Sequence, residues 1–409
     1  MEHVVVVGSS LAGLRACETL RTEGFTGTIT MVGSEPHLPY DRPPLSKKYL
    51  SGEWNTEQIA LRRPESLGEL SLTLKLGAAA VALDTTAQRL QLADGTSLGY
   101  DGLVIATGAN CRKLPGQPNL SGIHELRTLG DADALRADLS NRTSPARVVV
   151  IGAGFIGLEV AATAREPYGC EVTVLEGLPA PLVRGLGAEM GNAVALVHSD
   201  HGVTIRCGVQ VSAIEGDGSR VTGVRLGSGE VVPADIVVVG IGVVPATEWL
   251  TDGRIEVRDG VVCDATLRTA VPGVYAAGDI ARWYNGLYGE EMRVEHWTTA
   301  ADQGAAAASN LLAVSRGEEP KAFEAVPFFW SDQFEARVQY LGRAAGDDEV
   351  RVVHGSVDDR KFVALYGSKG RFRGALGVTL PKKLMPYRKL LQERASWDDA
   401  LAFAAEKGN

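Results

Sequence analysis

Two segments of the chain share one order of hydrophobic and polar positions. In each, a short apolar run is followed by a glycine-rich turn, a helical pattern and a second apolar run. The parts of the first segment are residues 3–7, 8–13, 14–21 and 28–32, and those of the second are residues 147–151, 152–157, 158 to about 165, and 171–175. Short apolar runs on either side of an amphipathic segment are typical of a strand–helix–strand unit with parallel strands. The pattern therefore predicts two such units in one chain.

Both glycine-rich turns have the spacing that binds a dinucleotide pyrophosphate. The three key positions are filled by Gly152, Gly154 and Gly157 in the second turn and by Gly8, Ser10 and Gly13 in the first. The first glycine permits the tight turn, the second lets backbone approach the pyrophosphate, and the third lets the helix pack on the strand. The free N–H groups of the helix N-terminus then face the phosphates. Ser10 departs from the pattern but is small enough for close approach.

An acidic residue ends each unit. Glu35 follows Gly13 by 22 residues, and Glu176 follows Gly157 by 19. A carboxylate at about this distance accepts hydrogen bonds from the adenosine ribose of a bound dinucleotide. At Glu176 it would repel a 2′-phosphate, and residues 177–179 contain no arginine, so the sequence favours NADH over NADPH. The alternative is a solvated acid at a strand end.

Three further apolar runs break into turns of small residues, at residues 102–108, 236–242 and 273–279. Each could be an ordinary buried parallel strand with a glycine turn. The last run ends in Ala277-Gly278-Asp279 and follows both units. A carboxylate there could accept hydrogen bonds from a polyol such as the ribityl chain of a flavin.

Composition excludes several classes of protein. The 409 residues are 45% apolar and 22% charged, with a mean hydropathy near zero, which is unlike disordered or membrane-spanning chains. The length predicts two or three domains. The amino terminus shows no basic leader, so we expect a cytoplasmic protein. The five cysteines are scattered and have no C-x-x-C spacing, which argues against disulfides, cysteine-bound zinc and an internal iron–sulfur cluster. The histidines are also scattered, so they do not suggest a metal site.

The charge is unevenly distributed. The net charge is −9, which argues against a nucleic acid partner. Between residues 361 and 394, however, nine basic residues accompany a single acid, Glu393. They are Lys361, Lys369, Arg371, Arg373, Lys382, Lys383, Arg388, Lys389 and Arg394. A solvated basic face is the usual explanation, and a docking surface for an acidic partner is the functional one.

With these motifs the chain resembles the flavoprotein disulfide reductase superfamily and, more closely, its bacterial ferredoxin reductases, which serve oxygenases and cytochrome P450 systems. The resemblance covers essentially the whole chain. It is carried by residues 7–13, 38–47, 106–108, 126–128, 152–159, 277–279 and 328–333. The most discriminating stretch is Pro-Tyr-Asp-Arg-Pro-Pro-Leu-Ser-Lys, from Pro39 to Lys47.

The resemblance implies FAD on the first unit and NADH on the second. The implied FAD contacts are Gly8, Ser10, Leu11, Ala12, Gly13, Glu35, Arg42, Lys47, Ala80, Ala106, Thr107, Gly108, Arg127, Gly278, Asp279 and Trp297. The implied NADH contacts are Gly152, Gly154, Ile156, Gly157, Glu176, Gly242 and Glu295. His296 lies beside two of these residues, and we expect it to have a packing role.

Three residues are implied to be catalytic. The resemblance makes Lys47 and Glu159 an ion pair beside the flavin N5, where the lysine would stabilise charge on the reduced ring. Without it, both would be ordinary helix residues. Trp330 would line the flavin edge through which electrons leave, although a core tryptophan is the alternative. Residues 41–50, which carry a cysteine pair in the disulfide-reducing members, contain no cysteine here, so electrons must leave the flavin directly.

The expected fold is α/β, with two Rossmann-like three-layer dinucleotide-binding domains and a C-terminal α+β domain similar to that of glutathione reductase. The expected FAD domain is residues 1–113 and 244–322, the NAD domain is residues 114–243, and the C-terminal domain is residues 323–409. Alternating runs predict antiparallel strands at residues 336–341, 362–366 and 373–378, followed by a helix at about 387–394.

The expected reaction is electron transfer from NADH through FAD to an acidic [2Fe–2S] ferredoxin that docks near residues 361–394 and feeds a cytochrome P450 or oxygenase. Two alternatives stay open. One is reduction of rubredoxin, a quinone or another small acceptor. The other is a flavoprotein resembling apoptosis-inducing factors, in which NADH binding changes assembly and turnover is incidental.

Overall fold

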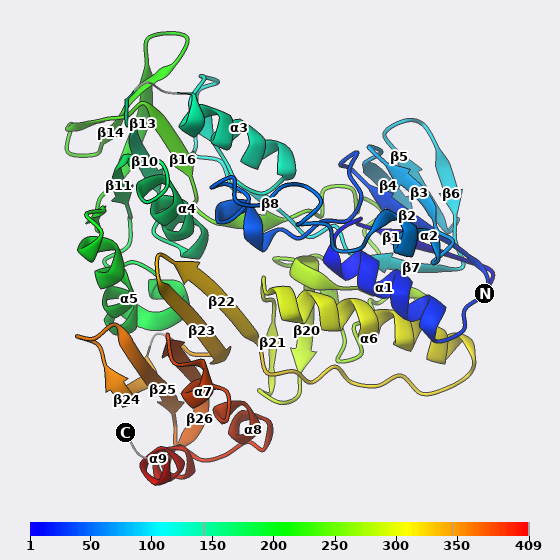
Figure 1. The fold of residues 1–409 in the computed structure, drawn as a ribbon. Coiled ribbons are helices and arrows are strands. Elements are labelled where there is room, and N and C mark those ends of the chain that lie inside the picture. The colour runs from blue at the N-terminus through cyan, green and yellow to red at the C-terminus, as the bar shows by residue number, and fades with distance from the viewer. Residues whose placement is uncertain (142–143, 346, 408–409) are drawn as a thin grey trace. The chain divides into compact units, whose positions relative to one another are not determined.

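The computed structural model describes residues 1–141, 144–345 and 347–407. The chain divides into two compact units, each made of three separate segments (Figure 1). The first unit is residues 1–41, 56–110 and 244–327, and the second is residues 42–55, 111–243 and 328–409. The predicted boundaries of the three domains stay a prediction.

The first unit is built on a five-stranded parallel sheet in the order β19-β7-β1-β2-β3. These strands are Val274–Ala276, Gly102–Ile105, His3–Val7, Thr28–Gly33 and Thr73–Leu76. Val4 to Val7 are fully buried or nearly so, as expected of a central parallel strand rich in β-branched residues. Helices α1 (Leu11–Thr22) and α6 (Trp297–Ser315) run side by side, blue and yellow in Figure 1.

The second unit contains a parallel sheet of the same kind, in the order β12-β11-β10-β16-β9. Its strands are Thr204–Arg206, Glu171–Leu175, Arg147–Ile151, Ile236–Val239 and Ile123–His124. Helix α4 (Phe155–Arg165) packs on β10 and β11, α5 (Val183–Asp200) on β12, and α3 (Leu129–Ser140) on β9. A meander of β13 (Val211–Gly216), β14 (Val221–Leu226) and β15 (Val231–Pro233) completes this part.

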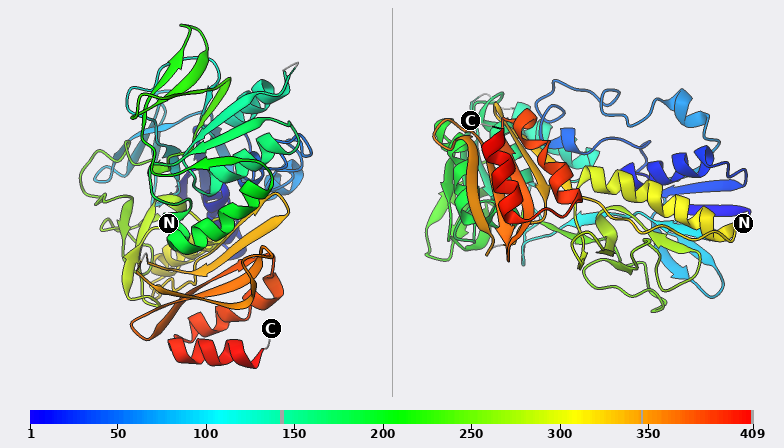
Figure 2. Two further views of the ribbon diagram at one scale, coloured as in Figure 1. Left: turned by 90° about the vertical axis from the view of Figure 1, so that its left-hand side faces the viewer. Right: turned by 90° about the horizontal axis from the view of Figure 1, so that it is seen from below.

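The C-terminal part of the second unit is an antiparallel sheet in the order β22-β23-β26-β25-β24, shown in orange and red in Figure 2. The strands are Phe328–Gln333, Ala336–Gly342, Arg371–Val378, Lys361–Ser368 and Glu349–Ser356. Helices α7 (Pro381–Leu384), α8 (Tyr387–Gln392) and α9 (Trp397–Glu406) follow. One hydrophobic core contains Val148 and Val150 of β10 together with Val338 of β23 and Phe362 of β25. The two sheets of this unit therefore share a core.

The remaining elements are short. They are η1 (Pro43–Ser46), α2 (Pro64–Gly68), β4 (Ala80–Asp84), β5 (Arg89–Leu92), β6 (Ser97–Gly99), β8 (Ala109–Cys111), β17 (Val243–Pro245), β18 (Val261–Cys263), η2 (Gly278–Ile280), β20 (Ala281–Asn285) and β21 (Glu290–Met292). Within the described residues, no helix is both long enough and apolar enough to cross a membrane.

The two predicted strand–helix–strand units are confirmed, with one correction. Strands β1, β10 and β11 have the predicted bounds, but α1 and α4 begin three residues earlier than predicted, at Leu11 and Phe155. The predicted starts, Leu14 and Leu158, directly follow the third glycine of each turn. In the structure that glycine lies inside the first helical turn, where it lets the helix pack closely on the strand.

Candidate active site

The turn between β1 and α1 has no room for side chains at its two glycines. Gly8 has a φ of +129°, and a Cβ there would lie 2.1 Å from the carbonyl oxygen of Ala106. A Cβ on Gly13 would lie 1.8 Å from the carbonyl oxygen of Gly8. Both positions therefore admit only glycine. The other predicted contacts of this turn, Ser10, Leu11 and Ala12, form the start of α1.

A second turn of the first unit, at Gly278 and Asp279, lies against the same helix. A Cβ on Gly278 would lie 3.1 Å from the Cβ of Ala12. The side-chain oxygen of Gln303, on α6, accepts a hydrogen bond from the Gly278 N–H at 2.9 Å. Gln303 is fully buried, and its Nε2 has no hydrogen-bond partner among the described residues. A buried amide donor left unsatisfied beside a glycine turn fits a polar ligand such as FAD. No sequence motif pointed to Gln303.

Two residues of the Pro39–Lys47 stretch bond to predicted FAD contacts within the first unit. The Tyr40 hydroxyl donates to the carboxylate of Glu35 at 2.6 Å. The indole N–H of Trp297, the first residue of α6, donates to the carboxylate of Asp41 at 2.6 Å. This discriminating stretch therefore fixes both side chains.

The remaining predicted contacts of the first unit lie at strand ends. Ala80 opens β4, and Ala106 and Gly108 follow β7 with Thr107 between them. The Thr107 hydroxyl donates to the carbonyl oxygen of Ala246 at 2.9 Å. Parallel sheets bind ligands beyond the carboxyl ends of their strands, where Ala106, Thr107 and Gly108 are found. Ala80 instead lies at the amino end of β4, which is part of an antiparallel sheet.

Glu295 forms an ion pair with Arg293 at 2.8 Å. The Arg293 guanidinium also donates to the carbonyl oxygen of Asp279 at 3.0 Å. Burial acts to lower the pKa of Arg293, but its hydrogen bonds to Glu295 and Asp259 raise that pKa above the usual range. Arg293 thus connects two predicted cofactor contacts, and nothing in the sequence pointed to it.

The three glycines of the turn in the second unit differ in the space around them. Gly152 has a φ of +107°, and its Cβ would lie 2.3 Å from the carbonyl oxygen of Gly240. The Cβ of Gly157 would lie 2.2 Å from the carbonyl oxygen of Gly152. At Gly154, the N-cap of α4, no atom of the protein lies within 4 Å of an added Cβ. The outer glycines are required by the protein itself, whereas the middle one leaves open space where a phosphate would approach.

Glu176 follows β11 and is held by the backbone. Its carboxylate accepts hydrogen bonds from the N–H of Ala153 at 2.8 Å and of Leu178 at 2.9 Å. Of the other predicted NADH contacts in this unit, Ile156 is half exposed on α4 and Gly242 has a φ of +99°. The carboxylate is thus fixed beside the glycine turn, as a ribose acceptor requires.

Replacing Gly154 by Ala is expected to leave folding intact and to weaken NADH binding. The added methyl meets no protein atom within 4 Å, and it would occupy the space where the pyrophosphate is predicted to lie. We expect the Kd for NADH to rise about tenfold, as for loss of roughly one hydrogen bond to a charged group. Titration calorimetry measures the Kd, and thermal unfolding of the ligand-free protein is the control. A lowered melting temperature with an unchanged Kd would contradict the assignment.

Lys47 and Glu159 form an ion pair in the second unit, with Nζ and Oε2 2.8 Å apart. Glu159, on α4, is only 2% exposed. Two hydroxyls donate to the same carboxylate: Ser46 to Oε2, and Ser331 of β22 to Oε1 at 2.6 Å. Three donors thus hold one buried carboxylate, which is the arrangement that a buried charge requires.

The other predicted site residues of the second unit include Arg42, Arg127 and Trp330. The Arg42 guanidinium donates to the carbonyl oxygen of Arg127. Trp330 is half buried on β22, and its ring lies 6.2 Å from that of Phe328. The predicted FAD contacts are therefore divided, since Arg42, Lys47 and Arg127 belong to the second unit and the rest to the first. All assignments of site residues stay predictions.

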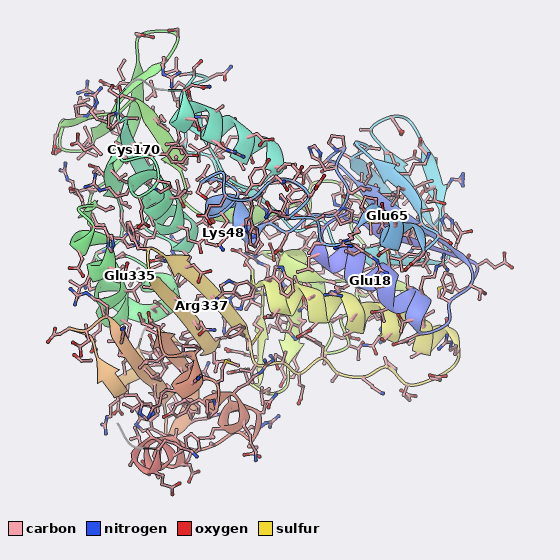
Figure 3. The ribbon with its side chains drawn as sticks, viewed as in Figure 1. Glu18, Lys48, Glu65, Cys170, Glu335 and Arg337 are labelled. Carbon is pink, nitrogen blue, oxygen red and sulfur yellow. The ribbon has the colours of Figure 1, made fainter. Side chains whose placement is uncertain are left out.

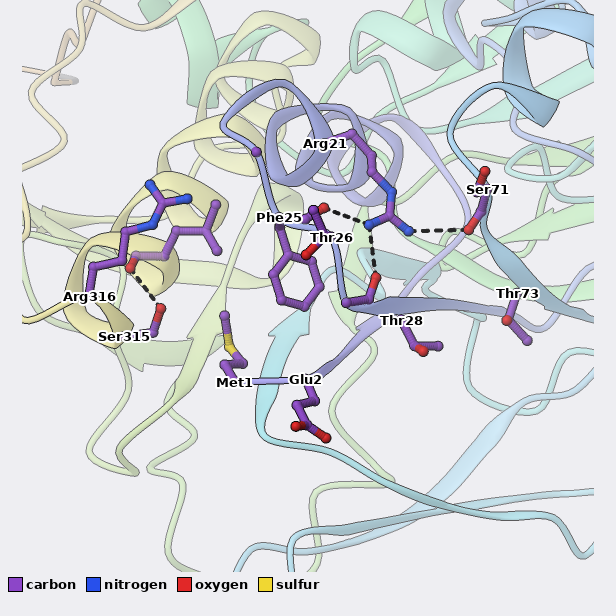
Figure 4. A pocket seen from close by; sticks show the side chains of 13 residues that line it. Met1, Glu2, Arg21, Phe25, Thr26, Thr28, Ser71, Thr73, Ser315 and Arg316 are labelled. Atoms are coloured by element: carbon purple, nitrogen blue, oxygen red, sulfur yellow. Dashed lines mark hydrogen bonds between the residues drawn. The ribbon is translucent and has the colours of Figure 1, made fainter.

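The lining of a hollow of about 800 Å³ in the first unit contains none of the predicted site residues (Figure 4). Its lining includes the residues just before β1 and the last turns of α1 and α6, at the amino ends of the parallel strands. The Arg21 guanidinium in it donates to the carbonyl oxygens of Phe25, Gly27 and Ser71. The polar groups of Arg21 are thus used by the protein itself.

Comparison with known proteins identifies the family of this chain. Residues 2–304 match the pyridine nucleotide-disulphide oxidoreductase family, and residues 328–407 match the reductase C-terminal family. The chain belongs to the pyridine nucleotide-disulphide oxidoreductases. The α/β fold and the sequence-based resemblance to ferredoxin reductases are confirmed.

Three similarities extend over nearly the whole of this oxidoreductase. It is 41% identical to rhodocoxin reductase of Rhodococcus erythropolis over 389 residues, which is 95% of this chain and 89% of the relative. It is 35% identical to putidaredoxin reductase of Pseudomonas putida over 96% of this chain and 92% of the relative. The crystal structure of the covalent putidaredoxin reductase–putidaredoxin complex matches with a TM-score of 0.90 and 33% identity, covering 100% and 99% of the two chains.

Proposed function

We propose that this oxidoreductase transfers electrons from NADH through FAD to a small [2Fe–2S] ferredoxin. The observation that carries the proposal is the presence of one glycine turn in each unit, each completed by a fixed carboxylate, Glu35 or Glu176. Residues 41–50, where disulfide-reducing relatives carry their cysteines, contain none. The relatives named as ferredoxin, rhodocoxin and putidaredoxin reductases support the same acceptor class.

FAD and a nicotinamide nucleotide are the cofactors of this family. In the proposal, the Gly8–Gly13 turn holds the FAD pyrophosphate, Glu35 its adenosine ribose and Asp279 its ribityl chain. The Gly152–Gly157 turn and Glu176 hold NADH. FAD, when bound, accepts a hydride and passes its electrons on one at a time.

The chain contributes positioning and charge to this chemistry. Lys47 presents a positive charge that its bonds to the buried Glu159 hold in one place. We place this charge at the flavin ring, where it would stabilise the reduced form more than the oxidised form. Trp330 is proposed to line the route by which electrons leave.

The proposed docking surface for an acidic ferredoxin is narrower than the whole basic stretch. Arg373 donates to the carbonyl oxygen of Arg343, so it has a structural task. Lys369 and Arg371 flank Gly370, whose carbonyl oxygen accepts a hydrogen bond from the N–H of Trp397. Trp397 begins α9, and the next two residues are the acids Asp398 and Asp399. These two acids lie outside residues 361–394 in sequence, but they reduce the positive charge around Lys369 and Arg371. We centre the proposed docking surface on the basic residues of α7 and α8, namely Lys382, Lys383, Arg388 and Lys389. Of these, Lys383 donates to the carbonyl oxygen of Lys407 at 3.3 Å and Lys389 pairs with Glu393 at 3.6 Å.

Reversing two of these charges is expected to weaken ferredoxin binding selectively. In Lys382→Glu/Lys383→Glu, we expect KM for an acidic ferredoxin to rise about tenfold at low salt and the salt dependence of the rate to weaken. NADH-driven flavin reduction should stay unchanged. Steady-state kinetics at several salt concentrations measure the first effect, and stopped-flow absorbance measures the second.

The matched control for the charge reversal is Lys113→Glu/Lys321→Glu, which makes the same change of net charge at exposed sites outside the basic stretch. An equal rise of KM in this variant would show a general charge effect. If KM for the ferredoxin rises in neither variant, the basic residues of α7 and α8 are ordinary solvated surface and not a docking site.

Reduction of cytochrome c by the purified flavoprotein tests the proposed function. NADH and NADPH are compared as donors, with and without candidate [2Fe–2S] ferredoxins. Stimulation by a ferredoxin with NADH as the better donor is expected. Without such stimulation the proposal fails. Reduction of rubredoxin or a quinone would instead support the alternative that the enzyme uses one of these acceptors. Slow flavin reduction, a long-lived charge-transfer absorbance and a change of oligomeric state on NADH addition would support the apoptosis-inducing-factor alternative.

Coupling to a cytochrome P450 or oxygenase and a cytoplasmic location complete the proposal. The named relatives include the anthranilate and p-cumate dioxygenase reductases. None of the five cysteines, all of which lie within the described residues, forms a disulfide, which fits a reducing compartment.

A further inference from the structure

A chain of polar side chains leads from Lys47 through Glu159 into the C-terminal part of the second unit. Beyond Glu159 it continues through Ser331 and Gln333 of β22 to His198 of α5. The successive heavy-atom distances from Glu159 are 2.6, 3.0 and 2.9 Å. Glu159, Ser331, Gln333 and His198 are each at most 2% exposed, so water does not compete for these bonds. All members belong to the second unit.

The strand geometry explains why β22 reaches the carboxylate. Alternate residues of a strand share one face, so Phe329, Ser331 and Gln333 point the same way. Phe329 meets Phe155 of α4, with ring centroids 4.6 Å apart. Glu159 lies one helical turn further along α4, within reach of Ser331. Figure 3 shows α4 and the β22–β23 hairpin, with Glu335 and Arg337 labelled at the hairpin.

The direction of every bond in this chain follows from the carboxylate. Glu159, ion-paired with Lys47, only accepts, so the Ser331 hydroxyl must donate to it. Ser331 then accepts from the Gln333 amide nitrogen, which leaves the Gln333 oxygen facing His198 Nε2. That nitrogen must carry a proton and donate. His198 needs only its neutral form for this, and burial lowers its pKa to about 4. No bond in the chain has a free choice of direction.

We propose that Ser331 is a positioning residue for the flavin-side lysine. Its hydroxyl, oriented by Gln333 and His198, fixes the Glu159 carboxylate and thereby the place of the Lys47 ammonium. This inference rests on the proposed function in so far as Lys47 acts on FAD. It goes further in assigning part of the control of flavin potential to the C-terminal segment, 172 residues away from Glu159 in sequence.

Packing alone does not account for the arrangement. Replacing a buried ion pair by apolar residues of similar volume is often neutral or stabilising, so a buried polar chain contributes little net stability. What it does supply is one fixed orientation for the carboxylate. The Ser46 hydroxyl binds the other carboxylate oxygen, so removing Ser331 frees only one side of Glu159 and keeps the Lys47 contact possible.

The experiment measures the two-electron midpoint potential of the bound flavin at neutral pH in a Ser331→Ala variant. A displaced positive charge stabilises the reduced ring less, so the potential should fall. We expect the reduction equilibrium constant to fall about tenfold, which is about 30 mV for a two-electron couple. Ser331→Thr keeps the hydroxyl, so its flavin potential should stay close to that of the unmodified protein. Ser368→Ala is the control, because it makes the same change on β25, another strand of the same sheet, without altering any charge.

Further variants keep the inference separable from the proposed function. If Lys47→Met leaves the potential unchanged, the placement of Lys47 at the flavin is wrong. If Lys47→Met lowers the potential and Ser331→Ala does not, this inference is wrong. Should Ser331→Ala fail to fold, Gln333→Leu removes the donor that orients Ser331, and it should lower the potential by a smaller amount. An unchanged potential in that folded variant also overturns the inference.

Discussion

A Gly13→Ala variant is expected to retain almost no FAD. The added Cβ would lie 1.8 Å from the carbonyl oxygen of Gly8 and 3.0 Å from its carbonyl carbon. Both are backbone atoms of the turn itself, so neither can rotate away. The start of α1 must move off β1, which opens the turn proposed to hold the FAD pyrophosphate. We expect a cost of about 3 kcal/mol, the upper end of the usual cost of overpacking.

The flavin-to-protein absorbance ratio after purification measures this loss, and added FAD should not restore the ratio. Gly68→Ala is the matched control in the same unit, because nothing lies within 4 Å of an added Cβ at Gly68 and its φ is negative. A Gly13→Ala protein with full flavin content would show that the Gly8–Gly13 turn does not hold the cofactor.

Glu159→Gln is expected to lower stability and slow flavin reduction together. The amide has nearly the volume of the carboxylate but no charge, so the mostly buried Lys47 loses its counter-ion. Breaking a buried ion pair by removing one partner costs about 3 kcal/mol or more. With Lys47 no longer held, we also expect NADH-driven flavin reduction to slow about 100-fold, the usual effect of losing one preorganised electrostatic contact.

Urea unfolding measures the first effect and stopped-flow flavin absorbance the second. Glu166→Gln, at the exposed end of the same helix, is the control and should change neither. If Glu159→Gln is destabilised but reduces flavin at the normal rate, the pair has a structural role only.

The sequence predicted the parallel strands well because they are short valine-rich runs between glycine turns. It missed β24, where the sequence Glu-Val-Arg-Val-Val-His-Gly-Ser breaks the alternation and a register shift lies between Val352 and His354. It also missed α9, which starts from a capping box formed by Ser396 and Asp399. Such signals are short and local, so the periodicity of apolar positions does not detect them.

Part of the candidate site was beyond the reach of motif spacing. Glycine turns and terminal acids lie close together in the chain, so their order alone predicts a nucleotide site. Gln303, Arg293 and Ser331 act through partners that folding brings to them. Ser331 lies in the 328–333 stretch that carries the resemblance, but that stretch alone does not show which partner Ser331 meets, and no motif includes Gln303 or Arg293. The basic stretch shows the same limit, because the acids of α9 that reduce its charge lie outside it in sequence.

The shared core of the second unit has a consequence for synthesis on the ribosome. The parallel sheet around β10 is made long before the strands β23 and β25 that complete its core. At about 5–20 residues per second, roughly 10 to 35 s pass between the addition of Glu159 and that of Ser331. During this interval the apolar surface of the parallel sheet lacks its cover, and Glu159 lacks the bond from Ser331 while Ser46 and Lys47 are already made. Newly made chains should therefore depend on chaperones until the last 80 or so residues emerge.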